Sequence, residues 1–274
     1  MKQTNGAHQA DPDSAPLTRR THADPVEELG PREGVRLCVV IPVYNHGATV
    51  QKVVRECQRF FPVIVVDDGS TDQGPALLQE EPGITLLRLP ANRGKGAALR
   101  TGFARAEQGG FTHAITIDAD GQHAAGALME FAARCRKQPR ALIVGVRDLK
   151  AAKAPWARRV SNALSAFGFR LATGVRLTDT QCGYRVYPLA AVRGIQVDSE
   201  RYAFELEFLV KAAWSGIPLR LHSVQVDYRA PTSRQSHFHP LNDLFRIVRV
   251  HSRLAVQAVC TTERKRRLAL RAAG

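Results

Sequence analysis

The sequence predicts an α/β fold in which a mostly parallel sheet is flanked by helices. Short runs rich in β-branched residues alternate with helical stretches along most of the chain. These runs are apolar without alternation, which is typical of parallel strands that are covered on both faces. Polar residues follow directly after several runs, where the carboxyl ends of parallel strands meet at one edge of the sheet and bind ligands.

Strands and helices are expected to alternate between residues 37 and 146. The expected strands are Leu37–Val43, Pro62–Val66, Ile84–Leu89, His113–Ile117 and Ala141–Val146. The expected helices are Thr49–Phe60, Pro75–Glu81, Gly94–Gln108 and Ala124–Lys137. In the first helix, apolar residues recur at three- and four-residue spacing, which predicts one buried face.

The pattern changes after residue 148. We expect helices over Trp156–Thr173 and Phe204–Trp214 and an alternating strand over Leu219–Tyr228. The segment Thr178–Val186 runs from polar to aromatic residues and is assigned neither state. With no internal repeat, we predict one domain over residues 35–238, after a disordered tail over residues 1–34.

Composition and charge bound the class of protein. The chain has 274 residues, of which 44% are hydrophobic, and a formal net charge of +14. These values exclude a collagen-like, mucin-like or wholly disordered chain. No stretch approaches the ~18 apolar residues of a membrane span, and residues 1–31 contain no apolar core of a secretory signal. The scattered cysteines predict reduced thiols and a cytoplasmic location; they are Cys38, Cys57, Cys135, Cys182 and Cys260.

Residues 239–274 are strongly basic. Leu241–Cys260 predicts an amphipathic helix with an apolar face and a stripe of arginines, and Arg264–Arg267 adds four cations. Such a helix could lie peripherally on an anionic membrane surface at the inner face of the membrane. It could equally cover the core with its charges in water, and both interpretations stay open.

Two carboxylates follow the fourth expected strand. Asp118 and Asp120 are separated by one residue, and Gln122 adds a carbonyl oxygen. Mg²⁺ and Mn²⁺ prefer oxygen ligands, commonly one or two carboxylates together with substrate phosphates. An isolated pair of this kind is often only a turn, and its position after an apolar strand favours a metal site.

Two other polar segments predict contacts with a nucleotide. Asp67 and Asp68 follow the second strand, where an acid commonly accepts hydrogen bonds from a ribose or base; an Asp-Gly turn that caps the next helix is the alternative. Lys95, in a glycine-containing loop at a helix start, could contact a diphosphate. The loop lacks the Walker A spacing, and Leu99 stands at the third glycine position of the dinucleotide fingerprint.

Taken together, the motifs are more specific than their parts. The strings VVIPVYN, VIVVDDGSTD, LPANRGKGAALRTGF and ITIDADGQH occur in this order. This chain resembles the family-2 inverting glycosyltransferases with a GT-A fold. The later strings DTQCGYRVY and FELEFL are similar to the polyprenyl-phosphate group within that family, which includes dolichyl-phosphate mannosyl- and glucosyltransferases. The resemblance covers residues 37–228.

The resemblance implies roles for individual residues. The nucleotide-sugar site would comprise Pro42, Tyr44, Asn45, Asp67, Asp68, Lys95, Asp118, Arg147, Arg229 and Arg234. The metal ligands would be Asp118, Asp120 and Gln122. The acceptor side and the acidic helix would contribute Asp179, Arg185, Glu205 and Glu207, of which Glu207 matches better than Glu205. The chain departs from the family pattern at His46, Gln235 and His237.

The implied activity is metal-dependent transfer of a hexose from a UDP- or GDP-linked sugar to a polyprenyl-phosphate lipid at the cytoplasmic membrane face. A hydroxyl acceptor is an alternative, and it would require a general base, for which Asp179 is the candidate. A non-catalytic sugar-nucleotide binder is a further alternative. Nucleic acid is not an expected partner, because aromatic residues make up only 7% and no stacking platform accompanies the cations.

Overall fold

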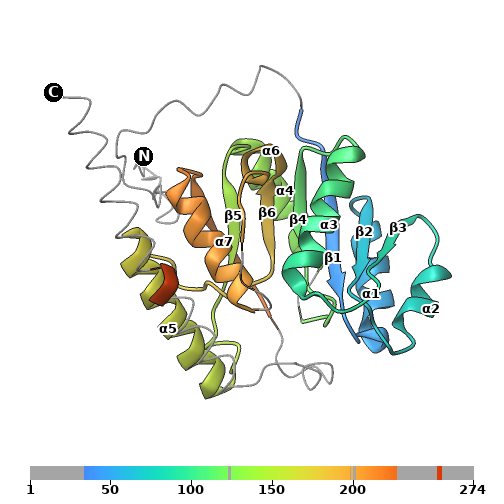
Figure 1. Cartoon of the computed structure of the whole chain (residues 1–274), viewed down its shortest axis with the longest axis horizontal. Helices are drawn as coiled ribbons and strands as arrows, with labels where there is room; N and C mark the ends of the chain where they lie inside the picture. Colours follow the sequence, from blue (N-terminus) through green and yellow to red (C-terminus); the bar gives the residue numbers. More distant parts are fainter. Residues whose placement is uncertain (1–33, 123–124, 198, 200–201, 227–251, 255–274) are drawn as a thin grey trace, which may run out of the picture.

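A computed structural model describes residues 34–122, 125–197, 199, 202–226 and 252–254. The predicted N-terminal tail lies outside these residues except for Gly34. Of the basic helix predicted over Leu241–Cys260, only Ser252–Leu254 are described, and they are helical. The described strands form one seven-stranded sheet in the order β3-β2-β1-β4-β6-β5-β7, with helices on both faces (Figure 1). This arrangement confirms the predicted α/β class.

The strands coincide closely with the apolar runs of the sequence. Their bounds are β1 Leu37–Val43, β2 Val63–Asp67, β3 Ile84–Arg88, β4 His113–Thr116, β5 Leu142–Arg147, β6 Arg185–Pro188 and β7 Leu219–Val224. Strand β1 pairs in parallel with β2 and with β4, so that Val39 lies opposite both Val63 and Ile115. Because β1, β2 and β4 are buried on both faces, their sequences show no polar alternation.

Strand β6 is antiparallel to both of its neighbours, β4 and β5. The sequence did not predict it, because the strand has only four residues and begins with Arg185, which is fully buried. Its direction has a consequence for the site. An antiparallel strand begins at the edge where parallel strands end, so residues 179–184 arrive at the same edge as the polar segments after β1, β2, β4 and β5.

Helices cover the sheet in two sets. Their bounds are α1 Gly47–Gln58, α2 Gly74–Gln79, α3 Lys95–Gln108, α4 Leu128–Lys137, α5 Trp156–Thr173, α6 Leu189–Val192 and α7 Tyr202–Trp214, with a 3₁₀ turn over Ala125–Ala127. Helices α1, α2 and α4 pack on one face of the sheet, while α3, α6 and α7 share the core of the other. In β1, Val39 and Ile41 face the first set, and Cys38 and Val40 face the second. Burial on both sides explains the uninterrupted apolar runs.

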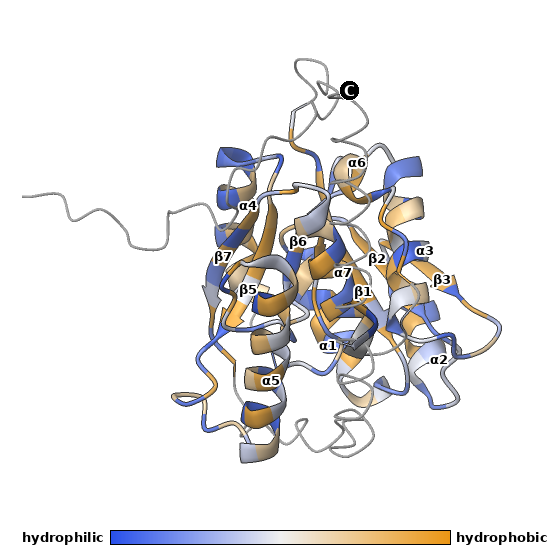
Figure 2. Ribbon diagram, turned by 60° about the vertical axis from the view of Figure 1, so that its left-hand side comes forward, coloured by the Kyte–Doolittle hydropathy of each residue, from blue (hydrophilic) through white to orange (hydrophobic). Residues whose placement is uncertain are grey.

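Helix α5 occupies an outer position. It packs on α7, and Phe169 is its one residue in the buried core on that face (Figure 1). Its bounds are those predicted, and it ends at Gly174, whose φ of 71° is the left-handed conformation typical of a helix C-terminus. The hydropathy colouring in Figure 2 alternates along α5, as expected for an amphipathic helix.

Four of the predicted thiols lie in the described part of the chain, and all four are buried and free: Cys38, Cys57, Cys135 and Cys182. Burial raises the pKa of Cys38 to about 12, so this thiol stays protonated at neutral pH. The four cysteines therefore act as small core residues.

Replacing Phe131 with Ala should lower the free energy of unfolding by about 3–5 kcal/mol, because it leaves a cavity in the core. Phe131 is fully buried, and its ring lies 4.5 Å from that of Tyr184 and 4.7 Å from that of His222, centroid to centroid. Urea unfolding would measure the change. Met129→Ala is the control on the same helix: Met129 is 48% exposed, and its loss should stay below about 1 kcal/mol. Equal losses would contradict this account of the core.

Candidate active site

The segments after β1 and β2 are joined by hydrogen bonds at one edge of the sheet. The backbone N–H of Asn45 donates to Ser70 Oγ at 2.9 Å, and the N–H of Thr71 donates to Asn45 Oδ1 at 2.9 Å. Asn45 has a φ of 55°, a left-handed conformation that asparagine tolerates better than most residues. Pro42 and Tyr44 lie in the same segment and are half-buried. The predicted nucleoside-pocket residues are therefore held together.

The acids after β2 fix the neighbouring loops. Asp67 Oδ1 accepts the N–H of Ser70 at 2.8 Å, and Asp67 also forms an ion pair with Arg88 at 3.2 Å. Asp68 Oδ1 accepts the N–H of Arg93 at 2.8 Å, which connects the end of β2 to the loop before α3. Burial raises the pKa of Asp68, although the N–H groups of Arg93 and Gly94 partly offset the rise. Asp67 thus supports the loop that carries Asp68.

Lys95 connects that loop to the predicted metal motif. The sequence predicts a diphosphate contact for Lys95; in the structure its ammonium lies between two carboxylates. Its Nζ is 2.5 Å from Asp118 Oδ1 and 2.6 Å from Glu205 Oε1. A Cβ on Gly183 would stand 2.6 Å from Asp118 Oδ1 and 2.7 Å from Lys95 Nζ, so only glycine fits beside this ion pair. Arg93 binds Asp68, and Lys95, two residues further along the chain, binds Asp118. The two acids therefore belong to one site.

Asp120 lies in the same carboxylate group. Its Oδ1 accepts the N–H of Gln122 at 3.0 Å, and the Thr49 hydroxyl donates to the carbonyl of Ala119 at 2.6 Å, which fixes the turn on α1. Burial, followed by the charge of Asp118, raises the pKa of Asp120 to about 6. Two carboxylates that repel each other in a partly buried turn form a favourable place for a cation.

These donors fit a divalent cation that is shared with a substrate. No group of three or more His, Cys, Asp or Glu side chains that could hold a metal occurs among the described residues. Asp118 and Asp120 offer two carboxylates, and Mg²⁺ or Mn²⁺ commonly takes its remaining ligands from phosphates and water. The buried side chain of Gln122 lies beside the two acids in sequence. The site therefore suits a metal that binds together with a phosphorylated ligand.

The two acids of α7 face different surroundings. Glu205 reaches the metal motif through Lys95. Glu207 pairs with Lys211 at 2.7 Å and with Arg253, and it accepts the N–H of Ser199 at 3.0 Å. Residues two apart on a helix point about 200° apart, so only one of the pair can face the site. Glu205, and not the better-matched Glu207, is the acid that pairs with Lys95 beside the metal motif, and the role predicted for Glu207 stays a prediction.

Arg147 and Asp179 form a buried pair. Arg147 Nε and Nη2 donate to the two Asp179 oxygens at 2.6 and 3.0 Å, and the Arg147 backbone N–H donates at 3.1 Å. Burial alone would raise the pKa of Asp179, but the charge and hydrogen bonds of Arg147 outweigh it and lower the pKa. A fully buried carboxylate with a lowered pKa is a poor proton acceptor. These contacts argue against the role as a general base that Asp179 would take with a hydroxyl acceptor, and they favour a role in orienting Arg147.

Arg185 also differs from its predicted acceptor contact. Its guanidinium is fully buried and donates to the carbonyls of Cys182, Thr180 and Glu205 at 2.9, 2.8 and 3.3 Å. These bonds fasten the segment before β6 to α7. Arg185 therefore holds Gly183 and Glu205 in place and has no surface left for a ligand. Two further predicted residues, Arg229 and Arg234, lie outside the described residues.

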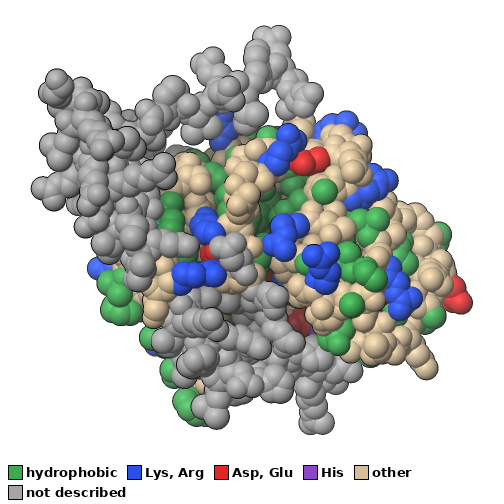
Figure 3. All heavy atoms as spheres, in the orientation of Figure 1, with side chains coloured by type: hydrophobic (Ala, Val, Ile, Leu, Met, Phe, Trp, Pro, Cys, Tyr) green, Lys and Arg blue, Asp and Glu red, His purple; other side chains and the backbone are tan. Residues whose placement is uncertain are grey.

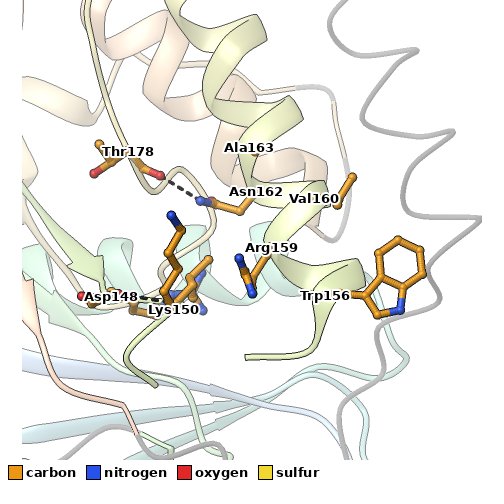
Figure 4. A pocket seen from close by; sticks show the side chains of 10 residues that line it. Asp148, Lys150, Trp156, Arg159, Val160, Asn162, Ala163 and Thr178 are labelled. Carbon is orange, nitrogen blue, oxygen red and sulfur yellow. Dashed lines mark hydrogen bonds between the residues drawn. The ribbon is translucent and has the colours of Figure 1, made fainter. Parts of the chain in front are cut away.

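A pocket of about 600 Å³ opens beside Arg147, between the loop after β5 and the first half of α5 (Figure 4). Cations line it, namely Arg147, Lys150 and Arg159, together with the apolar side chains of Leu149, Trp156 and Val160. The amide of Asn162 donates to the carbonyl of Thr178 at 2.8 Å, which closes one side. The positive charge of Arg158, in the first turn of α5, lowers the pKa of Asp120. Arg158 precedes the pocket residue Arg159 in the chain, and Arg147 is the pocket residue that the sequence singles out as a site residue.

Comparison with known proteins agrees with this architecture. Glycosyl transferase family 2 matches residues 38–193. An undecaprenyl-phosphate mannosyltransferase of Micrococcus luteus is 27% identical over 195 residues, which cover 66% of this chain and 79% of that protein. A UDP-N-acetylglucosamine–dolichyl-phosphate N-acetylglucosaminyltransferase of Methanococcus voltae is 28% identical over 197 residues, 64% of this chain and 78% of that protein.

A similar solved structure is glucosyl-3-phosphoglycerate synthase from Mycobacterium tuberculosis in complex with Mn²⁺, UDP and phosphoglyceric acid. It superposes with a TM-score of 0.61 at 17% identity, over 82% of this chain and 78% of that chain. The likeness shows the fold, which is the GT-A arrangement of glycosyltransferases. The chain belongs to glycosyl transferase family 2, and it is a glycosyltransferase of this family.

Lys95→Met should lower the free energy of unfolding by about 3 kcal/mol or more, because Asp118 and the buried Glu205 lose their shared cation. Glu205→Gln should therefore cost less in the Lys95→Met protein than in the wild type. We expect a coupling energy of about 1–3 kcal/mol in the double-mutant cycle, measured by urea unfolding. Additive losses would show that the two charges do not act together.

Asp120→Asn should stabilise the metal-free protein at about pH 8, by roughly 1–3 kcal/mol. The folded protein holds the ionised Asp120 at a cost, because its pKa is raised from 3.8 to about 6. As the pH falls through about 6, the wild-type carboxyl gains its proton in the folded state and the cost disappears. The difference between the two proteins should therefore vanish near pH 4, in urea unfolding at a series of pH values. Glu80→Gln, at an exposed carboxylate, is the control, and a difference that does not depend on pH would contradict the prediction.

Proposed function

We propose that this glycosyltransferase moves a hexose from a UDP- or GDP-linked sugar to a polyprenyl-phosphate lipid, with inversion at the anomeric carbon and with Mg²⁺ or Mn²⁺. The observation that carries the proposal is the pocket beside Arg147, which combines three cations with apolar side chains. A phosphate with a long apolar chain needs both kinds of lining. The names of the two relatives and the ligands of the solved structure support the same acceptor class and a metal-bound nucleotide.

The proposal assigns the donor to the segments after β1, β2 and β4. Asp68 and the Asn45 segment would hold the nucleoside, because a carboxylate has about four acceptor positions and the N–H groups of Arg93 and Gly94 do not use them all. Asp118, Asp120 and Gln122 would hold the cation, which neutralises charge on the diphosphate that leaves. Lys95 keeps Asp118 in place and balances part of its charge, as the 2.5 Å contact requires.

The acceptor would bind on the other side of Gly183. A lipid phosphate is already anionic at neutral pH, so its oxygen can attack the anomeric carbon without a general base. The new bond forms as the bond from that carbon to the nucleoside diphosphate breaks. Arg147 would bind the acceptor phosphate, with Lys150 and Arg159 nearby, while Asp179 fixes the plane of the guanidinium. In this assignment the fully buried, ionised Asp179 orients Arg147 and does not act as a general base.

The direct test is turnover. Wild-type protein with Mn²⁺ should transfer hexose from at least one UDP- or GDP-hexose to a short-chain polyprenyl phosphate, with the glycolipid detected by mass spectrometry. The proposal also places the reaction at the cytoplasmic face of a membrane, where both substrates would have to meet. No transfer from any donor in such a panel would overturn it, and so would transfer to free sugar hydroxyls alone.

Arg147→Lys should raise the KM for the lipid phosphate by about tenfold or more and leave the KM for the nucleotide sugar nearly unchanged. Lysine keeps the charge but loses the bidentate bond to Asp179 that orients the side chain. Arg193→Lys is the matched control, because Arg193 also binds one carboxylate, Glu107, but is exposed and distant in the fold on α6. An unchanged acceptor KM in Arg147→Lys, by steady-state kinetics, would remove Arg147 from the acceptor site.

A further inference from the structure

Helix α5 buries its polar side and exposes its apolar side. Its buried face carries Ser161, Asn162 and Ser165, which hydrogen bond to the segment that precedes β6. Ser161 Oγ accepts from Gln181 Nε2 at 3.0 Å, and Ser165 Oγ accepts from the hydroxyl of Thr180 at 2.7 Å. Phe169 is the one fully buried apolar side chain of α5, so the buried face of this helix is mostly polar, the reverse of an ordinary surface helix.

The opposite side of α5 is a stripe of large apolar side chains, which we call the α5 stripe. Its members and their exposed fractions are Trp156 76%, Val160 53%, Leu164 38%, Phe167 57% and Leu171 71%. Spacings of four, four, three and four residues place all five on one face, over a length of about 22 Å. Hydrophobic side chains are visible at the lower left of the molecule, over α5 (Figure 3). An exposed apolar row of this size marks an interaction surface.

The surroundings of the stripe carry mostly positive charge. Residues 150–178 contain six Lys or Arg and no Asp or Glu. Arg159 and Arg170 are exposed and, from their positions on the helix, flank the stripe on one side. The remaining cations of this segment are Lys150, Lys153, Arg158 and Arg176. Asp148 is the one acid that lines the pocket together with Trp156 and Val160. An apolar row with a mostly cationic border matches a partner surface that is apolar inside and negative at its boundary.

We propose that the α5 stripe lies in the interface of an anionic lipid bilayer, with its arginines at the level of the phosphates. This is the geometry of an amphipathic helix that lies in the plane of a membrane. A second copy of the chain fits less well, since two α5 helices packed face to face would bring Arg159 and Arg170 against the same cations of the partner. Among the described residues, none of the helices has the length and apolar character to cross a bilayer.

The stripe and the pocket share two residues, Trp156 and Val160. This step rests on the proposed function, in which the acceptor is a lipid phosphate. With α5 docked on the membrane, the pocket then faces the lipids directly. The acceptor would enter by sliding its phosphate along the interface towards Arg147, while its chain stays in the bilayer. The membrane contact itself depends only on the stripe and its charges.

The test is co-sedimentation of the full chain with vesicles of phosphatidylcholine, with and without phosphatidylglycerol. The double variant Phe167→Gln/Leu171→Gln removes two stripe residues that do not line the pocket and keeps good helix formers. The matched control, Phe60→Gln/Met129→Gln, removes two exposed apolar residues that lie elsewhere, 39% and 48% exposed. We expect wild type and control to bind the anionic vesicles alike, more weakly at high salt, and the stripe variant to bind at least about tenfold more weakly.

Three results would overturn the inference. The first is equal binding of the stripe variant and the wild type, and the second is no binding of the wild type to anionic vesicles. The third is a wild-type dimer in sedimentation equilibrium that the stripe variant abolishes, which would assign the stripe to a second copy. Transfer to a water-soluble short-chain polyprenyl phosphate should be the same for wild type and stripe variant. Vesicle binding without any such transfer would instead refute the proposed function and leave the membrane contact standing.

Discussion

The ion pairs of Lys95 are the interaction on which the site depends. Asp118, Asp120 and Glu205 bring three carboxylates to one partly buried region, and the ammonium of Lys95 binds two of them. It thereby joins α3, the end of β4 and α7, which belong to both halves of the chain. Unpaired carboxylates in such a place would repel one another and either separate or take up protons. The charge of Lys95 offsets this repulsion and keeps the carboxylates together.

The antiparallel strand β6 makes this arrangement possible. Because β6 begins at the edge where its parallel neighbours end, Gly183 can lie against the Lys95–Asp118 pair, where any side chain would clash. The same segment carries Asp179 to Arg147. One reversed strand therefore places Gly183, beside Asp118, and Asp179, the partner of Arg147, at the same edge.

Helix α5 shows a compromise between stability and function. Its polar inner face costs apolar burial, and its hydrogen bonds to residues 178–181 are worth only about 1 kcal/mol each. If α5 were rotated by half a turn about its own axis, it would bury the five large side chains of the α5 stripe. The observed orientation is understandable if the apolar face is needed at the surface, next to the pocket that it partly lines.

The sequence by itself determined the parallel strands, the covering helices and the motifs after β1, β2 and β4, because uninterrupted apolar runs and the polar residues that end them are local features. Only the tertiary structure decided the direction of β6, the pairing of Glu205 rather than Glu207 with Lys95, and the pairing of Asp179 with Arg147. Lys95 and Glu205 are 110 residues apart, and no local pattern encodes such a contact. The outward turn of the apolar face of α5 was likewise undetermined, since periodicity gives the faces of a helix but not which of them is buried.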